Sequence, residues 1–544
     1  MTDSEETGTG GARVGLLRSA LGMSGITLLS RILGLVREQV RAHFLGTTFA
    51  SDAFGIAFQI PNLLRRLVGE GAMSAAFIPI FTEEKQLHGE EQAFRFARRF
   101  FNLSLLALTL ISTLGVVGAG VIVSCFALIG GRPVPAEAQE LTTSLTRLMF
   151  PYIALVSWAA IAQGVLNTFR VFWVSALTSV LLNISIIFFA VLLATSFDGP
   201  AGLPPEASTA AGASYGFAIG VLAGGLLQLL FQLPFVYRLG FRWRPDFTPG
   251  PAVRRALWLL VPTLFGAGVY QINVLISQAI AWGIGTGAVS SLQYSQRLLE
   301  LTLGVFAVAI STVALPSLAA DAAVGARDRV ADTLLYSVRL CCFVCFPVTA
   351  AFLLLGRETA SMLFERGMFG SVSSSWTAYA ISFHILALTH IALARVLVPV
   401  YYAYKDTRTP VLIAFVVMVI NVALCYLLAP AFDLGGIALA NSLSALAQAL
   451  LLGVLLRKHL GVISDSVTGV SIGKSIAATG VMIVAVQALA YTLKLDTLHG
   501  FQELALPYSA VALVGIASYV TACVVLRHGE LREFRALLNR GGDA

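Results

Sequence analysis

Charged residues are scarce in this sequence: Asp, Glu, Lys and Arg together make up 12% of its 544 residues, whereas 57% are hydrophobic. Soluble globular proteins carry about twice that share of charge, so the scarcity excludes a water-soluble fold. In a bilayer every backbone N–H and C=O group needs a partner within the protein, which restricts membrane spans to helices or a closed barrel. The apolar runs are about 20 to 30 residues long, which predicts helices because barrel strands alternate over about ten residues.

Motifs for catalysis and metal binding are also lacking. The sequence has no P-loop and no HExxH, and its seven histidines are scattered. All six cysteines lie in apolar runs, and the CxxC of Cys342 and Cys345 has no second cysteine pair or histidine nearby, which predicts small buried side chains. His384 and His390 are six residues apart on one predicted helix, so they lie on different faces and favour helix packing. We expect no enzymatic activity, no metal and no cofactor.

Fourteen apolar segments follow one another along the chain, separated by turn-forming residues such as Asp198-Gly199-Pro200 and Lys405-Asp406. The segments are 19–46, 51–82, 100–130, 141–169, 172–197, 211–237, 256–282, 288–320, 331–356, 376–404, 409–430, 434–456, 470–493 and 505–526. Each is long enough to cross the hydrocarbon core as a helix, which takes about 20 residues. The sequence therefore predicts an all-α polytopic membrane protein of about fourteen transmembrane helices.

The distribution of Lys and Arg predicts how the chain is oriented. With the N-terminus in the cytoplasm, 23 of the 36 Lys and Arg residues fall on the cytoplasmic side and four on the opposite side. Cytoplasmic loops are enriched in these residues, so both termini are predicted to be cytoplasmic, as an even number of helices requires. The net charge of +7 comes from short loops and not from a basic domain, so no nucleic-acid partner is expected.

A weak internal repeat suggests how the helices are grouped. At an offset of 237 residues the first two helices match the seventh and eighth at four positions: Gly46, Gln59, Ser74 and Pro79 against Gly283, Gln296, Ser311 and Pro316. Four matches also fit chance, so the repeat is a hypothesis. A six-helix repeat preserves orientation and predicts two lobes related by an axis along the membrane normal. The predicted parts are a cytoplasmic tail (1–18), an N-terminal six-helix lobe (19–240), a C-terminal six-helix lobe (241–460), and two additional helices with the C-terminus (461–544).

Nine arginines lie within the apolar segments, where an arginine at mid-helix costs roughly 2.5–3.5 kcal/mol on insertion scales. Near a helix end, as at Arg41, the long side chain can reach the interface or pair locally. Arg31 differs because it lies about 18 Å along a segment that starts at residue 19, at a rise of 1.5 Å per residue. We therefore expect Arg31 to face a polar cavity or a buried partner.

Polar residues gather on one face of the first, second and eighth helices. Thr27, Arg31, Gly34, Glu38 and Arg41 recur at spacings of three and four, which places them on one helical face. In the second helix a proline removes a backbone hydrogen bond and can open the helix towards a cavity. The candidate site residues are Ser30, Arg31, Arg37 and Glu38 in the first helix, Asp52, Gln59, Asn62 and Arg65 in the second, and Gln296, Arg297 and Glu300 in the eighth.

These faces carry an excess of positive charge. Four arginines (Arg31, Arg37, Arg65 and Arg297) exceed what the nearby acids can neutralise if the outer acids pair locally. Excess guanidinium suits an anion, and its paired donors fit phosphate oxygens. The alternative is a buried salt-bridge network that holds the lobes together. The two interpretations overlap, because arginine pairs can serve as a gate and as a binding site.

A long pattern in the first two helices resembles a known family. It comprises residues 30–38 (SRILGLVRE), 51–54 (SDAF), 61–66 (PNLLRR), 70–72 (EGA) and 77–79 (FIP). This pattern is similar to that of the MurJ/MviN family, bacterial lipid II flippases of the MOP exporter superfamily. Fourteen helices with cytoplasmic termini are also that family's layout, so the resemblance covers nearly the whole chain.

The resemblance implies two six-helix lobes around a central cavity, with the last two helices shaping a groove for a polyprenyl tail. It implies transport of lipid II, an undecaprenyl-pyrophosphate-linked disaccharide pentapeptide, from the inner to the outer leaflet for peptidoglycan assembly. The family's cavity arginines fall on Arg31, Arg37, Arg65 and Arg297, and its first-lobe aspartate on Asp52. Some relatives have an acid before the eighth-helix arginine; this chain has Gln296 there, which leaves Glu300 for any such role.

We therefore expect alternating access in the bacterial cytoplasmic (inner) membrane. The four arginines would bind pyrophosphate, Asp52, Glu38 and Glu300 would act in gating or coupling, and four polar side chains would support them: Ser30, Asn62, Gln59 and Gln296. The expected partners are lipid II, membrane lipids and cell-wall synthesis enzymes. Two alternatives stay open: a related exporter of another polyprenyl-linked saccharide or of a drug, and a scaffold that binds lipid II without transporting it.

Overall fold

The computed structural model describes residues 6–65, 67, 76–199, 204–305, 318, 320–461 and 465–531, apart from the side chains of residues 6–24, 64–65, 261–267, 270 and 305. In these residues the secondary structure is helical, with a single isolated bridge between Arg366 and Phe369. The predicted all-α fold is confirmed. The chain forms two compact units, Met1–Leu275 and Ile276–Ala544. The lobe boundaries expected at residues 240 and 460 stay predictions.

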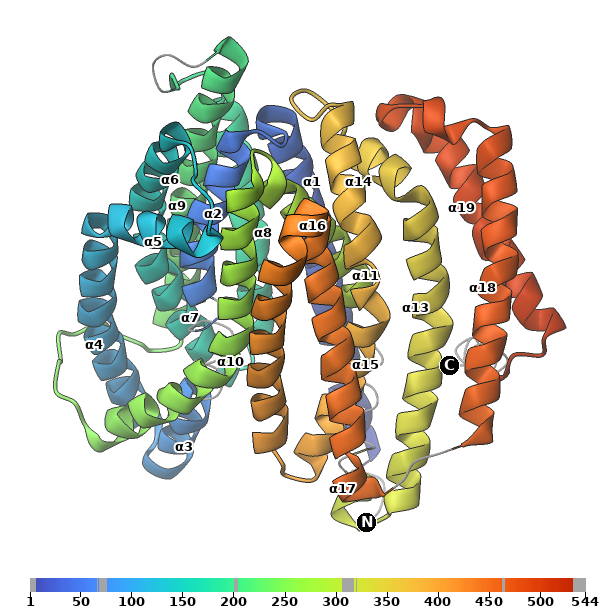
Figure 1. The fold of residues 1–544 in the computed structure, drawn as a ribbon. Coiled ribbons are helices and arrows are strands. Elements are labelled where there is room, and N and C mark those ends of the chain that lie inside the picture. Colours follow the sequence, from blue (N-terminus) through green and yellow to red (C-terminus); the bar gives the residue numbers. More distant parts are fainter. Residues whose placement is uncertain are drawn as a thin grey trace. The chain divides into compact units, whose positions relative to one another are not determined.

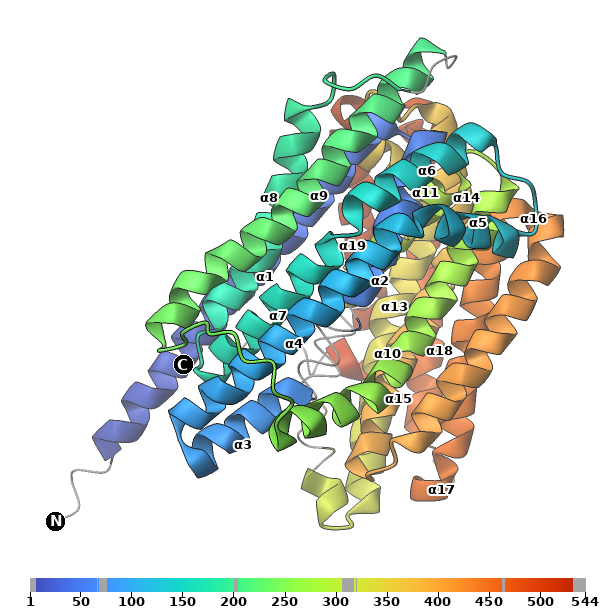
Figure 2. The same ribbon diagram turned by 90° about the vertical axis from the view of Figure 1, so that its left-hand side faces the viewer.

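The first unit contains the first nine helices and most of the tenth. Its helices are α1 (Glu6–Leu45), α2 (Phe49–Arg65), α3 (Ile78–His88), α4 (Glu90–Val117), α5 (Ala119–Gly130), α6 (Ala136–Met149), α7 (Tyr152–Thr168), α8 (Phe172–Leu192), α9 (Pro205–Arg238) and α10 (Pro251–Ile284). α1 packs along α8, which in turn packs along α9 (Figure 2). α1 begins at Glu6, before the apolar segment predicted from residue 19.

Glycines let α8 and α9 approach closely. A β carbon at Gly220 on α9 would lie 2.7 Å from the Cα of Ile186 on α8, and the Gly220 carbonyl accepts a 2.9 Å hydrogen bond from Ser185 Oγ. Gly216 and Gly224 extend the same face by one turn in each direction. Small residues at this spacing allow close backbone contact between membrane helices. The three glycines, spaced four residues apart, therefore serve the packing of α9 against α8.

Gly220→Ala should separate α8 from α9, because the atoms that its methyl group would meet belong to the α8 backbone and cannot rotate away. Overpacking of this kind typically costs about 1–3 kcal/mol. We expect a lower melting temperature for the purified protein in detergent. The matched control is Gly480→Ala on α18 (Ser466–Thr492), where an added β carbon meets nothing within 4 Å. Equal melting temperatures for the two variants would contradict the close contact.

The second unit contains the remaining helices. They are α11 (Ala288–Val305), α13 (Arg327–Phe364), α14 (Ser371–His384), α15 (Ala387–Ala403), α16 (Arg408–Leu455), α17 (Arg457–Leu460), α18, the 3-10 turn η2 (Leu495–Thr497) and α19 (Gly500–Val525). α18 and α19 pack against each other and against α13 (Figure 1). Tyr519 on α19 donates a 2.6 Å hydrogen bond to the Phe343 carbonyl on α13, which fixes the hairpin to that helix.

Every predicted apolar segment lies mostly on helix in its described residues. Eight helices in the described ranges are long and apolar enough to cross a membrane, or nine if α14 and α15, bent by 45°, form one span. The count is lower than fourteen partly because α16 joins the segments predicted at 409–430 and 434–456, with a break at Asp433, whose φ is 47°. Apolar side chains face outwards: Leu506 is 81% exposed and Leu513 66%. Such a surface requires lipid as solvent.

The cysteines are free, and five of the six are buried. Cys341, Cys342 and Cys345 lie within α13, so the CxxC is part of helix packing. The predicted burial is wrong for Cys125 on α5, which is exposed. No group of three or more potential metal ligands occurs within the residues that the structure describes.

Candidate functional site

Glu38 lies between two arginines in the last third of α1. Its Oε1 accepts a 2.5 Å hydrogen bond from Arg37 Nη2, and its Oε2 lies 3.7 Å from Arg41 Nη1. The side chains of Arg37, Glu38 and Arg41 are 15%, 9% and 7% exposed. Two guanidinium groups therefore share one carboxylate in a largely buried place. Glu38 and Arg41 are three residues apart, which places them on one face of the helix.

Arg41 connects α1 to the start of α2. Its Nε donates to Ser51 Oγ at 3.2 Å, its Nη2 donates to the Ser51 carbonyl at 2.9 Å, and its guanidinium lies 5.5 Å from the Phe54 ring centroid. The local pairing predicted for Arg41 is confirmed. Asp52, the predicted gating or coupling acid, follows Ser51 and is 1% exposed. This residue is therefore buried directly after the one that joins α2 to α1.

Asn183 joins α8 to α1. Its Oδ1 accepts a 3.0 Å hydrogen bond from Arg37 Nη1, and its Nδ2 donates to the carbonyls of Ser30 (3.3 Å) and Ser179 (3.0 Å). Ser30 thus contributes its backbone to this junction. Sequence reasoning missed Asn183, whose only signal is an amide side chain in an apolar helix, 146 residues from its arginine partner.

Arg31 is exposed, in contrast to Arg37 and Arg41. Its neighbours on α1 are exposed too, with Leu28 at 59% and Ile32 at 52%. No ion pair of Arg31 is recorded among the described residues. The middle of α1 therefore presents an exposed guanidinium group.

The α2 residues fall into two groups. Asn62 is 8% exposed and Gln59 is half-buried, and both precede the end of the helix by a turn or two. Pro61 lies between them, inside the helix, as predicted. Arg65 is the last residue of α2, and its side chain is outside the described residues.

In the second unit, Arg297 and Glu300 pair on α11. Arg297 Nη1 donates to Glu300 Oε2 at 3.2 Å, and Gln296 Nε2 donates to Glu300 Oε1 at 3.3 Å. The side chains of Arg297 and Glu300 are 33% and 30% exposed. The predicted polar face of this helix is therefore partly exposed, and Glu300 accepts hydrogen bonds from both Gln296 and Arg297. The expectation that Arg297 shares one cavity with the first-unit arginines stays a prediction.

A buried polar network, also in the second unit, centres on His384 at the end of α14. His384 is 4% exposed; its Nδ1 lies 2.9 Å from Ser295 Oγ on α11 and its Nε2 lies 3.1 Å from Asn441 Nδ2 on α16. An amide nitrogen donates, so Nε2 accepts and the ring proton is on Nδ1. Asn441 Oδ1 also accepts from Asn421 Nδ2 at 2.8 Å and from Ser277 Oγ at 3.4 Å. The packing role predicted for His384 is confirmed, but the residues around it carry no common sequence signal.

The family model for lipid II flippase MurJ matches residues 41–505 of this chain. The chain belongs to the MurJ family. A Burkholderia cenocepacia relative, named lipid II flippase MurJ, is 35% identical over 82% of this chain and 84% of its own. A Vibrio cholerae relative, named probable lipid II flippase MurJ, is 34% identical over 94% of this chain and 96% of its own.

Solved structures agree on the fold. A lipid II flippase MurJ in an inward-closed conformation matches with a TM-score of 0.75 at 24% identity, over 93% of this chain and 98% of that one. An inward-facing multidrug-resistance MATE transporter of the MOP superfamily matches with a TM-score of 0.64 at 15% identity, over 81% and 98%. This MurJ-family chain is therefore a multi-pass bacterial membrane protein of a transporter family.

Proposed function

We propose that this chain translocates lipid II from the inner to the outer leaflet of the bacterial cytoplasmic membrane by alternating access. Membership of the MurJ family supports this substrate, because the curated relatives carry it in their name. The observation that carries the proposal is Arg31, an exposed guanidinium group at the middle of a membrane helix. Such a group is costly in lipid and suits the pyrophosphate of lipid II.

Arg37, Arg65 and Arg297 complete the proposed pyrophosphate site. Arg37 already donates to Asn183 and Glu38, so it would bind the substrate only after exchanging one of these partners. Arg297 is a third exposed, and its partner Glu300 could release it on the same helix. Arg31 has no described contact that it would have to exchange. We therefore propose that it is the first of these arginines to bind the phosphate.

Three acids are proposed for gating or coupling: Asp52, Glu38 and Glu300. Glu38 and Glu300 each contact an arginine of the proposed site, so a change in either carboxylate alters how that arginine is held. Asp52 is buried beside the residue that Arg41 contacts. Four polar residues would support these groups: Ser30, Asn62, Gln59 and Gln296.

The chain would move its substrate without chemical change, so we propose no enzymatic activity. The excess of Lys and Arg in alternate loops supports cytoplasmic termini. Cell-wall synthesis enzymes, which make and consume lipid II, are the proposed protein partners.

The test is a flipping assay with the purified chain in proteoliposomes that contain fluorescent lipid II. A membrane-impermeant quencher is added outside the proteoliposomes. When the chain is present, lipid II from the inner leaflet should move to the outer leaflet, where its fluorescence is quenched. In empty liposomes the fluorescence of the inner-leaflet lipid II should persist. A scaffold would bind lipid II without exposing this pool. An exporter of another substrate would neither bind lipid II nor expose it, and either result would overturn the proposal.

A further inference from the structure

A cavity of about 310 Å³ lies in the second unit where α18 begins and the chain leaves α19. Its wall combines one residue of α13, the first turns of α18 and the segment after α19. The lining side chains include three cations and one carboxylate: Arg339, Lys474, Arg527 and Glu530. None of the arginines proposed to bind lipid II is among its lining residues.

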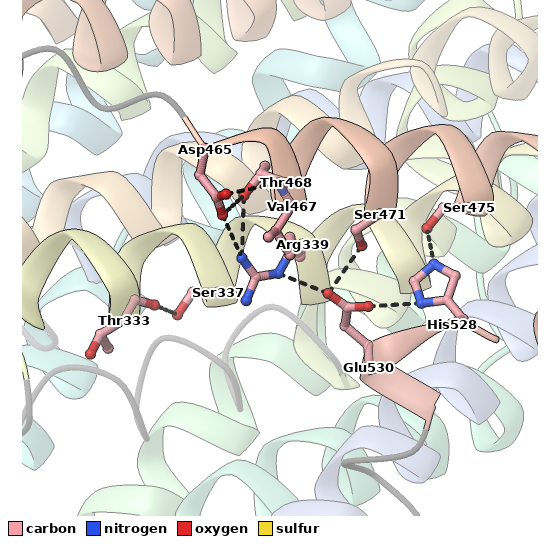
Figure 3. Close-up of polar contacts among 10 residues, drawn as sticks. All are labelled: Thr333, Ser337, Arg339, Asp465, Val467, Thr468, Ser471, Ser475, His528 and Glu530. Atoms are coloured by element: carbon pink, nitrogen blue, oxygen red, sulfur yellow. Dashed lines mark hydrogen bonds and ion pairs between the residues drawn. The ribbon is translucent and has the colours of Figure 1, made fainter.

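A fixed ion network forms one wall of the cavity (Figure 3). Arg339 Nε donates to Glu530 Oε1 at 2.8 Å, and its Nη1 lies 3.4 Å from Asp465 Oδ2. Glu530 also accepts from Ser471 Oγ at 3.0 Å, and its Oε2 lies 2.7 Å from His528 Nδ1. Two carboxylates thus neutralise Arg339, and the network joins α13, α18 and the segment after α19.

Lys474 and Arg527 add two positive charges beside this network, in which Arg339 and its two carboxylates carry one net negative charge. Lys474 Nζ donates to the Arg527 carbonyl at 3.2 Å, which holds the two residues together. In the part of the chain that the structure describes, no carboxylate pairs with either side chain. Arg527 is exposed and has a φ of 51°, a left-handed conformation that residues with a β carbon rarely adopt. The cavity therefore presents two cationic groups from adjacent helix ends.

Apolar side chains border the same cavity. Val467 and Val470, which line it on α18, are 59% and 57% exposed. α18 has 27 residues and is about 40 Å long, whereas the hydrocarbon core is about 30 Å thick. Its first turns therefore reach the headgroup layer, and Lys474 can extend its amine towards that layer.

We propose that this cavity binds the phosphate of an anionic phospholipid, with Lys474 and Arg527 contacting the headgroup and Val467 and Val470 contacting the acyl chains. Basic pockets between membrane helices recognise such headgroups. A free phosphate ion would use the cations but leave the apolar border unoccupied, so the combination favours a lipid. The inference does not rest on lipid II transport.

The test measures lipid binding to the purified full-length chain in detergent by native mass spectrometry, with phosphatidylglycerol and phosphatidylcholine as probes. Each cation near an anionic lipid surface contributes about fivefold in affinity. Lys474→Gln combined with Arg527→Gln should therefore weaken phosphatidylglycerol binding about 25-fold and leave phosphatidylcholine binding unchanged. Lys474→Arg with Arg527→Lys preserves both charges and should retain binding.

The matched control is Arg457→Gln with Lys458→Gln on α17. It removes the same two residue types from exposed positions that do not line the cavity. An equal loss in the control, or no loss in the cavity variant, would overturn the proposal. The assignment to a lipid would be overturned if millimolar inorganic phosphate displaces phosphatidylglycerol and binds the chain equally well when phosphatidylcholine is the lipid present. Melting temperatures for all variants establish that each is folded.

Discussion

Replacing Arg31 with Gln is expected to abolish growth of a flippase-depleted bacterium that depends on this chain, while the protein accumulates normally in the membrane. A hydrogen bond to a charged group contributes about 1.5–3 kcal/mol, so its loss should weaken lipid II binding roughly 10- to 100-fold. Stability should not fall, because Arg31 is exposed and no carboxylate among the described residues would lose its partner. Complementation, together with immunoblotting of membranes, measures both effects.

The matched control for Arg31 is Arg95→Gln on α4. Arg95 is 42% exposed and lies 3.4 Å from Glu91, itself 84% exposed, so its removal should change neither growth nor protein level. Combining Arg31→Gln with Arg297→Gln should also abolish growth. Full growth of that double variant would exclude the arginines as pyrophosphate ligands.

Hydropathy predicted the helical segments well because the thickness of the bilayer sets the length of each span. It did not predict the breaks inside them. Phe150 and Pro151 separate α6 from α7, and α14 and α15 are bent by 45°. The break at Asp433 in α16, in contrast, lies between two segments that hydropathy predicted separately. The hydropathy of an apolar run is the same whether its backbone is straight or bent. The positions of these bends therefore depend on tertiary packing, which the hydropathy pattern does not contain.

The candidate site was predictable in its composition but not in its burial. Helical spacing correctly placed Arg31, Glu38 and Arg41 on one face of α1. Spacing cannot show where a second helix covers that face, and the structure buries Glu38 and Arg41 while Arg31 is exposed. Asn183 and Asn441 were missed for a related reason. Their partners lie 146 and 57 residues away, and single amides in apolar helices have no periodic signal.

These contacts separate two kinds of arginine on the same helix. Arg41 has its donors occupied by Ser51 and lies close to Glu38, so it fixes the geometry of α1 and α2. Arg31 has an exposed side chain and is available to a ligand. Arg37 is intermediate, because both of its recorded partners could be exchanged for phosphate oxygens. The contacts of Arg41 fit the buried-network interpretation, whereas anion binding at Arg31 stays a proposal.

Replacing Glu38 with Gln should lower the amount of folded protein, whereas Arg31→Gln should leave that amount unchanged. The substitution keeps the shape of the side chain but leaves the charges of Arg37 and Arg41, 15% and 7% exposed, without the carboxylate they share. Breaking a buried ion pair by removing one partner costs about 3–5 kcal/mol. Asn183 and Ser51 still accept hydrogen bonds from the two arginines, so we expect about 3 kcal/mol.

The measurement is the melting temperature in detergent together with the amount of protein in the membrane. Glu91→Gln is the control, because it removes a carboxylate of an exposed pair and should change stability by less than about 1 kcal/mol. If Glu38→Gln is as stable as the parent chain, the burial of Arg37 and Arg41 does not require the Glu38 carboxylate. Loss of flipping in that stable variant would then assign Glu38 to gating or coupling, whereas retained flipping would exclude it from both roles.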